Sequence, residues 1–117
     1  MGPTTLIVDD HEDFRRAARS LLEADGFVIV GEATDGREAE RAVAALRPSL
    51  VLLDIQLPGP DGLDVAERLA ARHDPPAVVL TSSRDASVYG RRLERTSARG
   101  FIQKHELSGT ALAELLG

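Results

Sequence analysis

Six polar or charged residues stand directly after short apolar runs in this sequence. They are Asp9 and Asp10 after TTLIV, Asp54 after LVLL, Thr81 and Ser82 after AVVL, and Lys104 after GFIQ. Three carboxylates held together repel one another, and a low-dielectric rim strengthens that repulsion, so the group needs a cation or raised pKa values. A hard divalent cation is the simplest solution. These residues therefore suggest metal binding by oxygen ligands, provided that the fold brings them together.

The composition of this acidic group favours Mg²⁺ over other metals. Mg²⁺ takes one or two protein carboxylates, keeps several waters and commonly binds phosphate oxygens as well. The missing ligand is then a phosphoryl group. His11 and His105 flank the same acidic residues. A nitrogen-rich metal site would need converging imidazoles rather than carboxylates, so we interpret neither histidine as a ligand.

The short apolar runs are predicted to be strands. Their interiors are rich in Val, Ile, Leu or Phe, and they span Thr4–Val8, Phe27–Ala33, Leu50–Leu53, Ala77–Leu80 and Gly100–Gln103. Strands that are apolar on both faces and alternate with helices imply a parallel sheet covered on both sides. We therefore predict one α/β domain over residues 1–117, with a doubly wound five-stranded parallel sheet. Ligands of such sheets bind outside the carboxyl ends of the strands, where all six residues would lie.

The segments between the strands show the spacing of amphipathic helices. The first two helices are indicated by apolar residues three and four apart: Phe14, Ala17, Ala18, Leu21 and Leu22, and then Ala39, Ala42, Val43 and Leu46. A third helix is predicted from Leu63 to Arg72. The last is predicted from about Gly109 to Leu116, capped by Ser108, with Leu107 and Leu112 as a hydrophobic staple.

The fourth helix, from about Ala86 to Thr96, is predicted to be the least stable. It offers Val88, Tyr89 and Leu93 to a core. Gly90 lies inside it and costs about 1 kcal/mol relative to alanine.

Composition narrows the classes of protein that this chain can belong to. The 117 residues carry a net charge of -5 and include no cysteine, which excludes disulfides and thiolate chemistry. The acidic balance argues against direct nucleic-acid contact, and no apolar run approaches the length of a membrane span. The N-terminus lacks the pattern of an export signal, so we expect a soluble protein of the cytoplasm.

Four stretches of the sequence resemble the signature motifs of the response-regulator receiver domain of bacterial two-component systems. They are LIVDDHEDFR, LVLLDIQLPGPDGL, VVLTSS and GFIQKHEL, in the family's order and spacing over nearly the whole chain. In detail, VDDHEDFR and ARGFIQKHELS are most similar to receivers of regulators that carry a helix-turn-helix output domain. The resemblance implies the flavodoxin-like (βα)5 receiver fold.

The resemblance also implies a role for each residue. Asp54 would accept a phosphoryl group from a phosphohistidine of a sensor histidine kinase. Asp9, Asp10, Asp54 and the backbone carbonyl of Gln56 would hold Mg²⁺. The domain would be a phosphoacceptor switch that assists its own phosphorylation and dephosphorylation, and not an enzyme.

The phosphoryl state would be detected by two side chains and relayed by a third. Lys104 would pair with one phosphoryl oxygen, and the hydroxyl of Thr81 would donate a hydrogen bond to another. Phe101 would then turn inward and change the affinity of a surface formed by the fourth helix, the fifth strand and the fifth helix. Relatives commonly have tyrosine there. A homodimer is a further partner that the family suggests.

Other interpretations of the same residues remain open at this level. Taken singly, the Asp9–Asp10 pair or Thr81 could cap a helix. An aspartyl-phosphate hydrolase would use the same nucleophile and metal, but it needs a general-acid carboxylate where Gln56 stands. A phosphorylation-independent interaction module of receiver fold is the main alternative, and it is expected when the acidic or lysine positions are lost.

Overall fold

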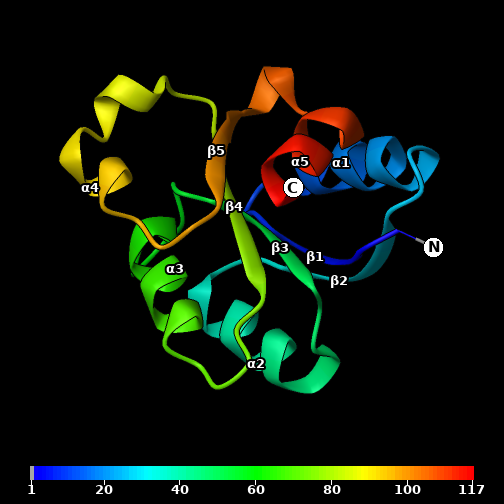
Figure 1. The fold of residues 1–117 in the computed structure, drawn as a ribbon, viewed down its shortest axis with the longest axis horizontal. Coiled ribbons are helices and arrows are strands. Elements are labelled where there is room, and N and C mark those ends of the chain that lie inside the picture. Colours follow the sequence, from blue (N-terminus) through cyan, green and yellow to red (C-terminus); the bar gives the residue numbers. More distant parts are fainter. Residues whose placement is uncertain (1) are drawn as a thin grey trace.

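Residues 2–117 are described by a computed structural model, in which five strands form one parallel sheet in the order β2-β1-β3-β4-β5 (Figure 1). The strands are β1 Thr4–Val8, β2 Val28–Ala33, β3 Leu50–Asp54, β4 Ala77–Ser82 and β5 Gly100–Gln103. The predicted doubly wound fold is confirmed. Two strands extend further than predicted, so Asp54, Thr81 and Ser82 occupy the last positions of strands instead of following them.

Helices cover both faces of the sheet (Figure 1). They are α1 Glu12–Ala24, α2 Gly36–Leu46, α3 Gly62–Ala70, α4 Arg91–Glu94 and α5 Gly109–Leu116, with 3-10 turns η1 Ala86–Val88 and η2 Lys104–Glu106. Apolar side chains of α1 and α5 pack on one face, and those of α2 and α3 on the other. Helix α3 ends two residues before the predicted Arg72.

Strand β3 lies at the centre of the sheet and all five of its residues are buried. Side chains alternate between the two faces of a strand. Accordingly, Leu50 and Leu52 join the core under α1 and α5, while Val51 and Leu53 join the core under α2 and α3. An apolar layer on each face therefore holds the backbone that ends at Asp54.

The predicted fourth helix is wrong as a continuous element. The segment is divided into η1 and the four-residue helix α4. Gly90 has a φ of +55°, outside the right-handed helical region, and so interrupts the helix between them. The predicted core role of Val88 is also wrong, because its side chain is 56% exposed, whereas Tyr89 and Leu93 do pack against the core.

Helices α3 and α5 each begin with a side-chain cap. The carboxylate of Asp61 accepts a hydrogen bond from the backbone N–H of Asp64 at the start of α3. The hydroxyl of Ser108 accepts one from Ala111 at the start of α5, as predicted. Within residues 2–117, no helix is long and apolar enough to cross a membrane.

Candidate functional site

The parallel sheet brings the predicted site residues to one edge. Asp9 follows β1, and Asp54 ends β3, the neighbouring strand. Thr81 pairs in register with Asp54 across β3 and β4. Lys104 follows β5, the strand next to β4. The carboxyl ends of these four strands therefore form the site.

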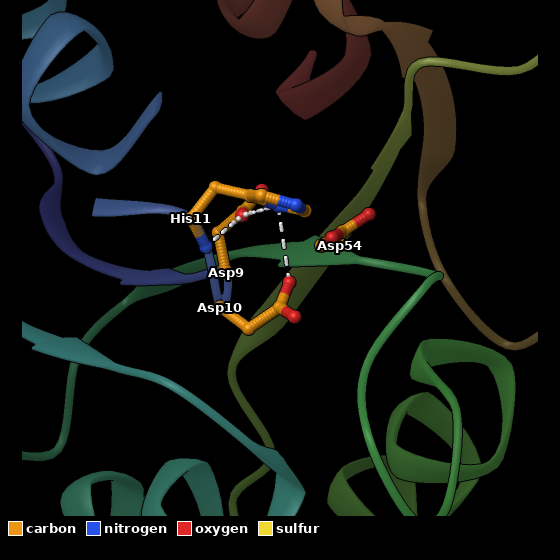
Figure 2. A group of neighbouring side chains, drawn as sticks. All are labelled: Asp9, Asp10, His11 and Asp54. Carbon is orange, nitrogen blue, oxygen red and sulfur yellow. Dashed lines mark hydrogen bonds and ion pairs between the residues drawn. The ribbon is translucent and has the colours of Figure 1, made fainter. Parts of the chain in front are cut away.

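An acidic cluster occupies this edge (Figure 2). Asp9, Asp10, His11 and Asp54 each offer one potential ligand atom, and these atoms all lie within 4.8 Å of one another. Asp9 and Asp54 are completely buried, whereas Asp10 is exposed. The three carboxylates that were predicted to hold a metal are thus together.

The two carboxylate oxygens of Asp54 have different surroundings. Its Oδ1 accepts a hydrogen bond of 3.2 Å from the backbone N–H of Gln56, but its buried Oδ2 has no hydrogen-bond partner among the described residues. Burial, and after it the negative charge of Asp9, raise the pKa of Asp54 from 3.8 to about 6, while Lys104 acts in the opposite direction. A buried carboxylate oxygen without a hydrogen bond fits a hard divalent cation.

Lys104 supplies the positive charge of the site. Its Nζ lies 2.7 Å from Oδ2 of Asp9 and 3.6 Å from Oδ2 of Asp54. The ammonium also lies 4.5 Å from the centre of the Phe14 ring on α1, a favourable cation–π arrangement. Phe14 was interpreted only as a core residue of the first helix. Its contact with Lys104 has no signal in the sequence, because it depends on tertiary packing between two segments that are far apart in the chain.

The two hydroxyls at the end of β4 have different surroundings. The Thr81 hydroxyl is buried and has no hydrogen-bond partner within residues 2–117. The side chain of Asp85, and not that of Thr81, caps the following η1 turn. The buried Ser82 hydroxyl shares a hydrogen bond with the Tyr89 hydroxyl and accepts another from the backbone N–H of Arg84. Thr81 is therefore the hydroxyl left available to a ligand.

Two residues complete the set singled out from the sequence. Gln56 lies two residues after Asp54, and its backbone N–H donates a hydrogen bond to Asp54 Oδ1. Phe101, on β5, is partly buried, and its ring centre lies 6.4 Å from that of Tyr89 at an interplanar angle of 57°. The ligand role of Gln56 and the switch role of Phe101 stay predictions.

His11 belongs to the cluster, although its sequence position was interpreted as that of a residue that is not a metal ligand. Its Nδ1 lies 3.0 Å from Oδ1 of Asp9 and 3.1 Å from Oδ1 of Asp10 (Figure 2). Its backbone N–H also donates to Oδ1 of Asp9 at 2.8 Å. A histidine beside an acidic pair was visible in the sequence, but the direction of its side chain was not.

Comparisons with known proteins agree with this arrangement. The family model described as the response regulator receiver domain matches residues 5–115. The putative positive transcription regulator BvgA of Bordetella pertussis is 39% identical over 101 residues, which cover 86% of this chain and 48% of BvgA. A putative transcriptional regulator of Pseudomonas aeruginosa is 45% identical over 95% of this chain and 52% of its own length. The chain spans about half the length of these curated relatives.

Solved structures show the same fold. The signal receiver domain of the putative response regulator NarL from Mycobacterium tuberculosis superposes with a TM-score of 0.87 and 30% identity, covering 99% of this chain and 98% of that one. A LuxR-family two-component response regulator from Aurantimonas has a TM-score of 0.87 and 26% identity over 100% of this chain and 87% of its own. The predicted resemblance is confirmed.

Proposed function

Because the chain belongs to the response regulator receiver domain family, whose members are phosphorylation-based signalling switches rather than enzymes, we propose that Asp54 is its phosphoacceptor. The phosphodonor is a phosphohistidine of a sensor histidine kinase. The single observation that carries this proposal is the buried Oδ2 of Asp54, which has no hydrogen-bond partner in the described part of the chain and lies in a cluster of two further aspartates and a lysine.

The transfer follows from the position of this oxygen. A carboxylate oxygen of Asp54 attacks phosphorus, the phosphorus–nitrogen bond breaks, and its electron pair returns to the imidazole of the kinase. The product is an aspartyl phosphate. Because β3 is packed on both faces, it holds Asp54 in one position, and phosphoryl transfer depends mainly on such positioning and on charge neutralisation.

Asp9, Asp10, Asp54 and the backbone carbonyl of Gln56 would hold Mg²⁺ in this proposal. When bound, the ion neutralises charge on the carboxylates and on the transferred phosphoryl oxygens. Asp54 has a pKa of about 6, so it is largely ionised at neutral pH and is able to act as a nucleophile. The metal and the lysine reduce the cost of that buried negative charge.

Lys104 and Thr81 are the residues that we propose to respond to the phosphoryl group. Lys104 Nζ is already 3.6 Å from Asp54, so a phosphoryl group attached there comes within its reach. Thr81 is the register partner of Asp54, and its hydroxyl has a hydrogen bond to donate. The phosphoryl group adds roughly -1.5 to -2 charges at one point and attracts both groups.

The downstream response is proposed to run through Phe101 and the segment around α4. Movement of Thr81 leaves room for the aromatic ring to turn inward. The segment consists of one 3-10 turn and one helical turn, so few backbone hydrogen bonds resist its rearrangement.

The partners of the whole protein are also proposals. One relative, EvgA of Escherichia coli, is named a DNA-binding transcriptional activator. We propose that this chain acts in the cytoplasm as one receiver domain, residues 1–117, within a transcription regulator. The domain itself carries a net charge of -5 and would not contact nucleic acid directly. A second copy of the domain is the proposed homodimer partner.

The test is the intact mass of the protein after incubation with acetyl phosphate, with and without Mg²⁺. We expect the wild type to gain one phosphoryl group only when Mg²⁺ is present. Asp54→Asn should gain none, whereas the matched control Asp64→Asn, which alters an exposed aspartate on α3, should behave as the wild type. No gain by a folded wild type would instead favour the phosphorylation-independent interaction module.

A further inference from the structure

The acidic cluster contains one nitrogen atom, Nδ1 of His11, that could ligate a metal and that oxygen-only binding would not use. His11 stands at the N-cap of α1, where its side chain makes no capping hydrogen bond. The imidazole instead reaches Asp9 and Asp10 through one atom, Nδ1 (Figure 2). The side chain is 66% exposed, so the other ring nitrogen is not needed to satisfy a buried partner.

The separations at Nδ1 match those of two neighbouring ligands on one metal ion. Adjacent ligand atoms of a six-coordinate ion with bonds of about 2.1 Å are about 3.0 Å apart. Nδ1 lies 3.0 Å from Oδ1 of Asp9 and 3.1 Å from Oδ1 of Asp10. The imidazole nitrogen therefore lies at the spacing of a neighbouring ligand from each of the two carboxylates.

The remaining groups of the cluster are compatible with a metal at this position. Lys104 is paired with the other oxygen of Asp9, Oδ2, and leaves Oδ1 facing His11. Asp54 contributes a second, independent observation, since its Oδ2 is buried and has no hydrogen-bond partner within residues 2–117, and one of its carboxylate oxygens belongs to the 4.8 Å group. Three protein carboxylates and one imidazole leave positions for water or a phosphoryl oxygen.

We propose that His11 ligates the metal through Nδ1, so that this site binds first-row transition ions such as Mn²⁺ and Co²⁺ through mixed nitrogen and oxygen ligands. Binding requires Nδ1 to be the unprotonated ring nitrogen, so that the proton of the neutral imidazole is on Nε2. Imidazole suits transition ions, whereas Mg²⁺ prefers oxygen ligands and gives up its waters reluctantly. The inference rests on the proposed function only in that the same carboxylates hold the metal.

The test compares Co²⁺ and Mg²⁺ binding by calorimetry on protein without a polyhistidine tag, at one fixed pH. The His11→Ala variant should bind Co²⁺ at least about tenfold more weakly, the smallest loss that even an outer-shell partner of a ligand causes. Its affinity for Mg²⁺ should change less than about threefold, because Mg²⁺ takes oxygen ligands. His105→Ala is the matched control, since His105 follows Lys104 at the same edge and is also exposed, and it should change neither affinity.

A spectroscopic measurement identifies the ligand directly. Protein with ¹⁵N-labelled histidine and bound Mn²⁺ should show ¹⁵N hyperfine coupling that persists in His105→Ala and disappears in His11→Ala. Equal losses of Co²⁺ and Mg²⁺ affinity in His11→Ala would mean that His11 only orients Asp9, and would overturn the inference. Unchanged Co²⁺ binding, with Mg²⁺-dependent phosphorylation intact, would overturn the inference and leave the proposed function standing. If neither ion binds the wild type, both proposals fail.

Discussion

Lys104 Nζ lies 2.7 Å from the buried Oδ2 of Asp9, closer than to Oδ2 of Asp54 at 3.6 Å. Lys104 is the only lysine of the chain, and its side chain is 16% exposed. It therefore neutralises part of the acidic cluster before any metal or phosphoryl group arrives. Phosphorylation would draw the ammonium away from Asp9 and toward Asp54.

Removing this charge should destabilise the metal-free protein. Removing one partner of a buried ion pair costs about 3 kcal/mol or more. Lys104→Ala should therefore lower the free energy of unfolding by a similar amount. Added Mg²⁺ should restore part of the loss. Urea unfolding of wild type and variant, with and without Mg²⁺, measures both effects. A loss that Mg²⁺ leaves unchanged would show that Lys104 acts by packing on Phe14 rather than by charge.

In the phosphorylation assay, Lys104→Ala should still accept a phosphoryl group from acetyl phosphate but lose the response around α4. Hydrogen exchange of residues 86–95 in the phosphorylated and unphosphorylated states measures that response. An exchange difference as large as that of the wild type would contradict the role proposed for Lys104.

Replacing Asp54 by asparagine should stabilise the protein above pH 6. The pKa of Asp54 is about 6 in the folded state against 3.8 as its ordinary value, so between these values the folded state retains a proton that the unfolded state releases. The free energy of unfolding therefore falls as pH rises through this window, and the whole of this destabilisation persists above it. The difference corresponds to about 3 kcal/mol, at about 1.36 kcal/mol per pKa unit.

The measurement is the free energy of unfolding of wild type and Asp54→Asn from pH 3.5 to 8 without Mg²⁺. The variant should be the more stable by about 2 to 3 kcal/mol at pH 7, and the two curves should converge near pH 4. Asp64→Asn, at an exposed carboxylate, should follow the wild type. Parallel curves across the whole range would mean that burial does not raise the pKa of Asp54.

The Tyr89 hydroxyl holds the segment before α4 to the end of β4 through Ser82. Tyr89→Phe keeps the ring against Phe101 but removes the hydrogen bond, and should lower the free energy of unfolding by about 1 kcal/mol. Hydrogen exchange should accelerate around residues 86–95 more than elsewhere. The double variant with Ser82→Ala tests the pair: if the effects of the two single changes simply add, the hydrogen bond contributes nothing.

Gly62 allows α3 to begin directly against the end of β3. A Cβ at this position would overlap the backbone carbonyl of Asp54 and lie 2.7 Å from Ile55 Cα. Gly62→Ala should therefore lower the free energy of unfolding by about 2 to 3 kcal/mol and weaken Mg²⁺ binding by shifting Asp54. Gly59, in the loop before α3, has a φ of +76°, and a Cβ there would meet no atom within 4 Å. Gly59→Ala should cost only about 1 to 2 kcal/mol, from backbone strain. Equal Mg²⁺ affinity in both variants would contradict the positioning role of Gly62.

Much of the site followed from local sequence. Runs that are apolar on both faces specify buried parallel strands, and parallel strands place their carboxyl ends together whatever the details of the helices. For this reason Asp9, Asp54, Thr81 and Lys104 were predicted to share one edge, and the structure brings them there. Caps such as Ser108 were equally predictable, because they depend on residues three positions apart.

The other contacts of the site depend on packing between segments that are distant in the sequence. The contact of the Phe14 ring with Lys104 depends on how α1 packs on the sheet. The choice of Thr81 over Ser82 as the available hydroxyl depends on where Tyr89 lies. The sequence of the fourth helical segment showed a weak point at Gly90, but whether a glycine is tolerated or ends a helix depends on the energy of the surrounding contacts. The imidazole of His11 lies between two carboxylates because of its side-chain rotamer, which spacing along a chain does not specify.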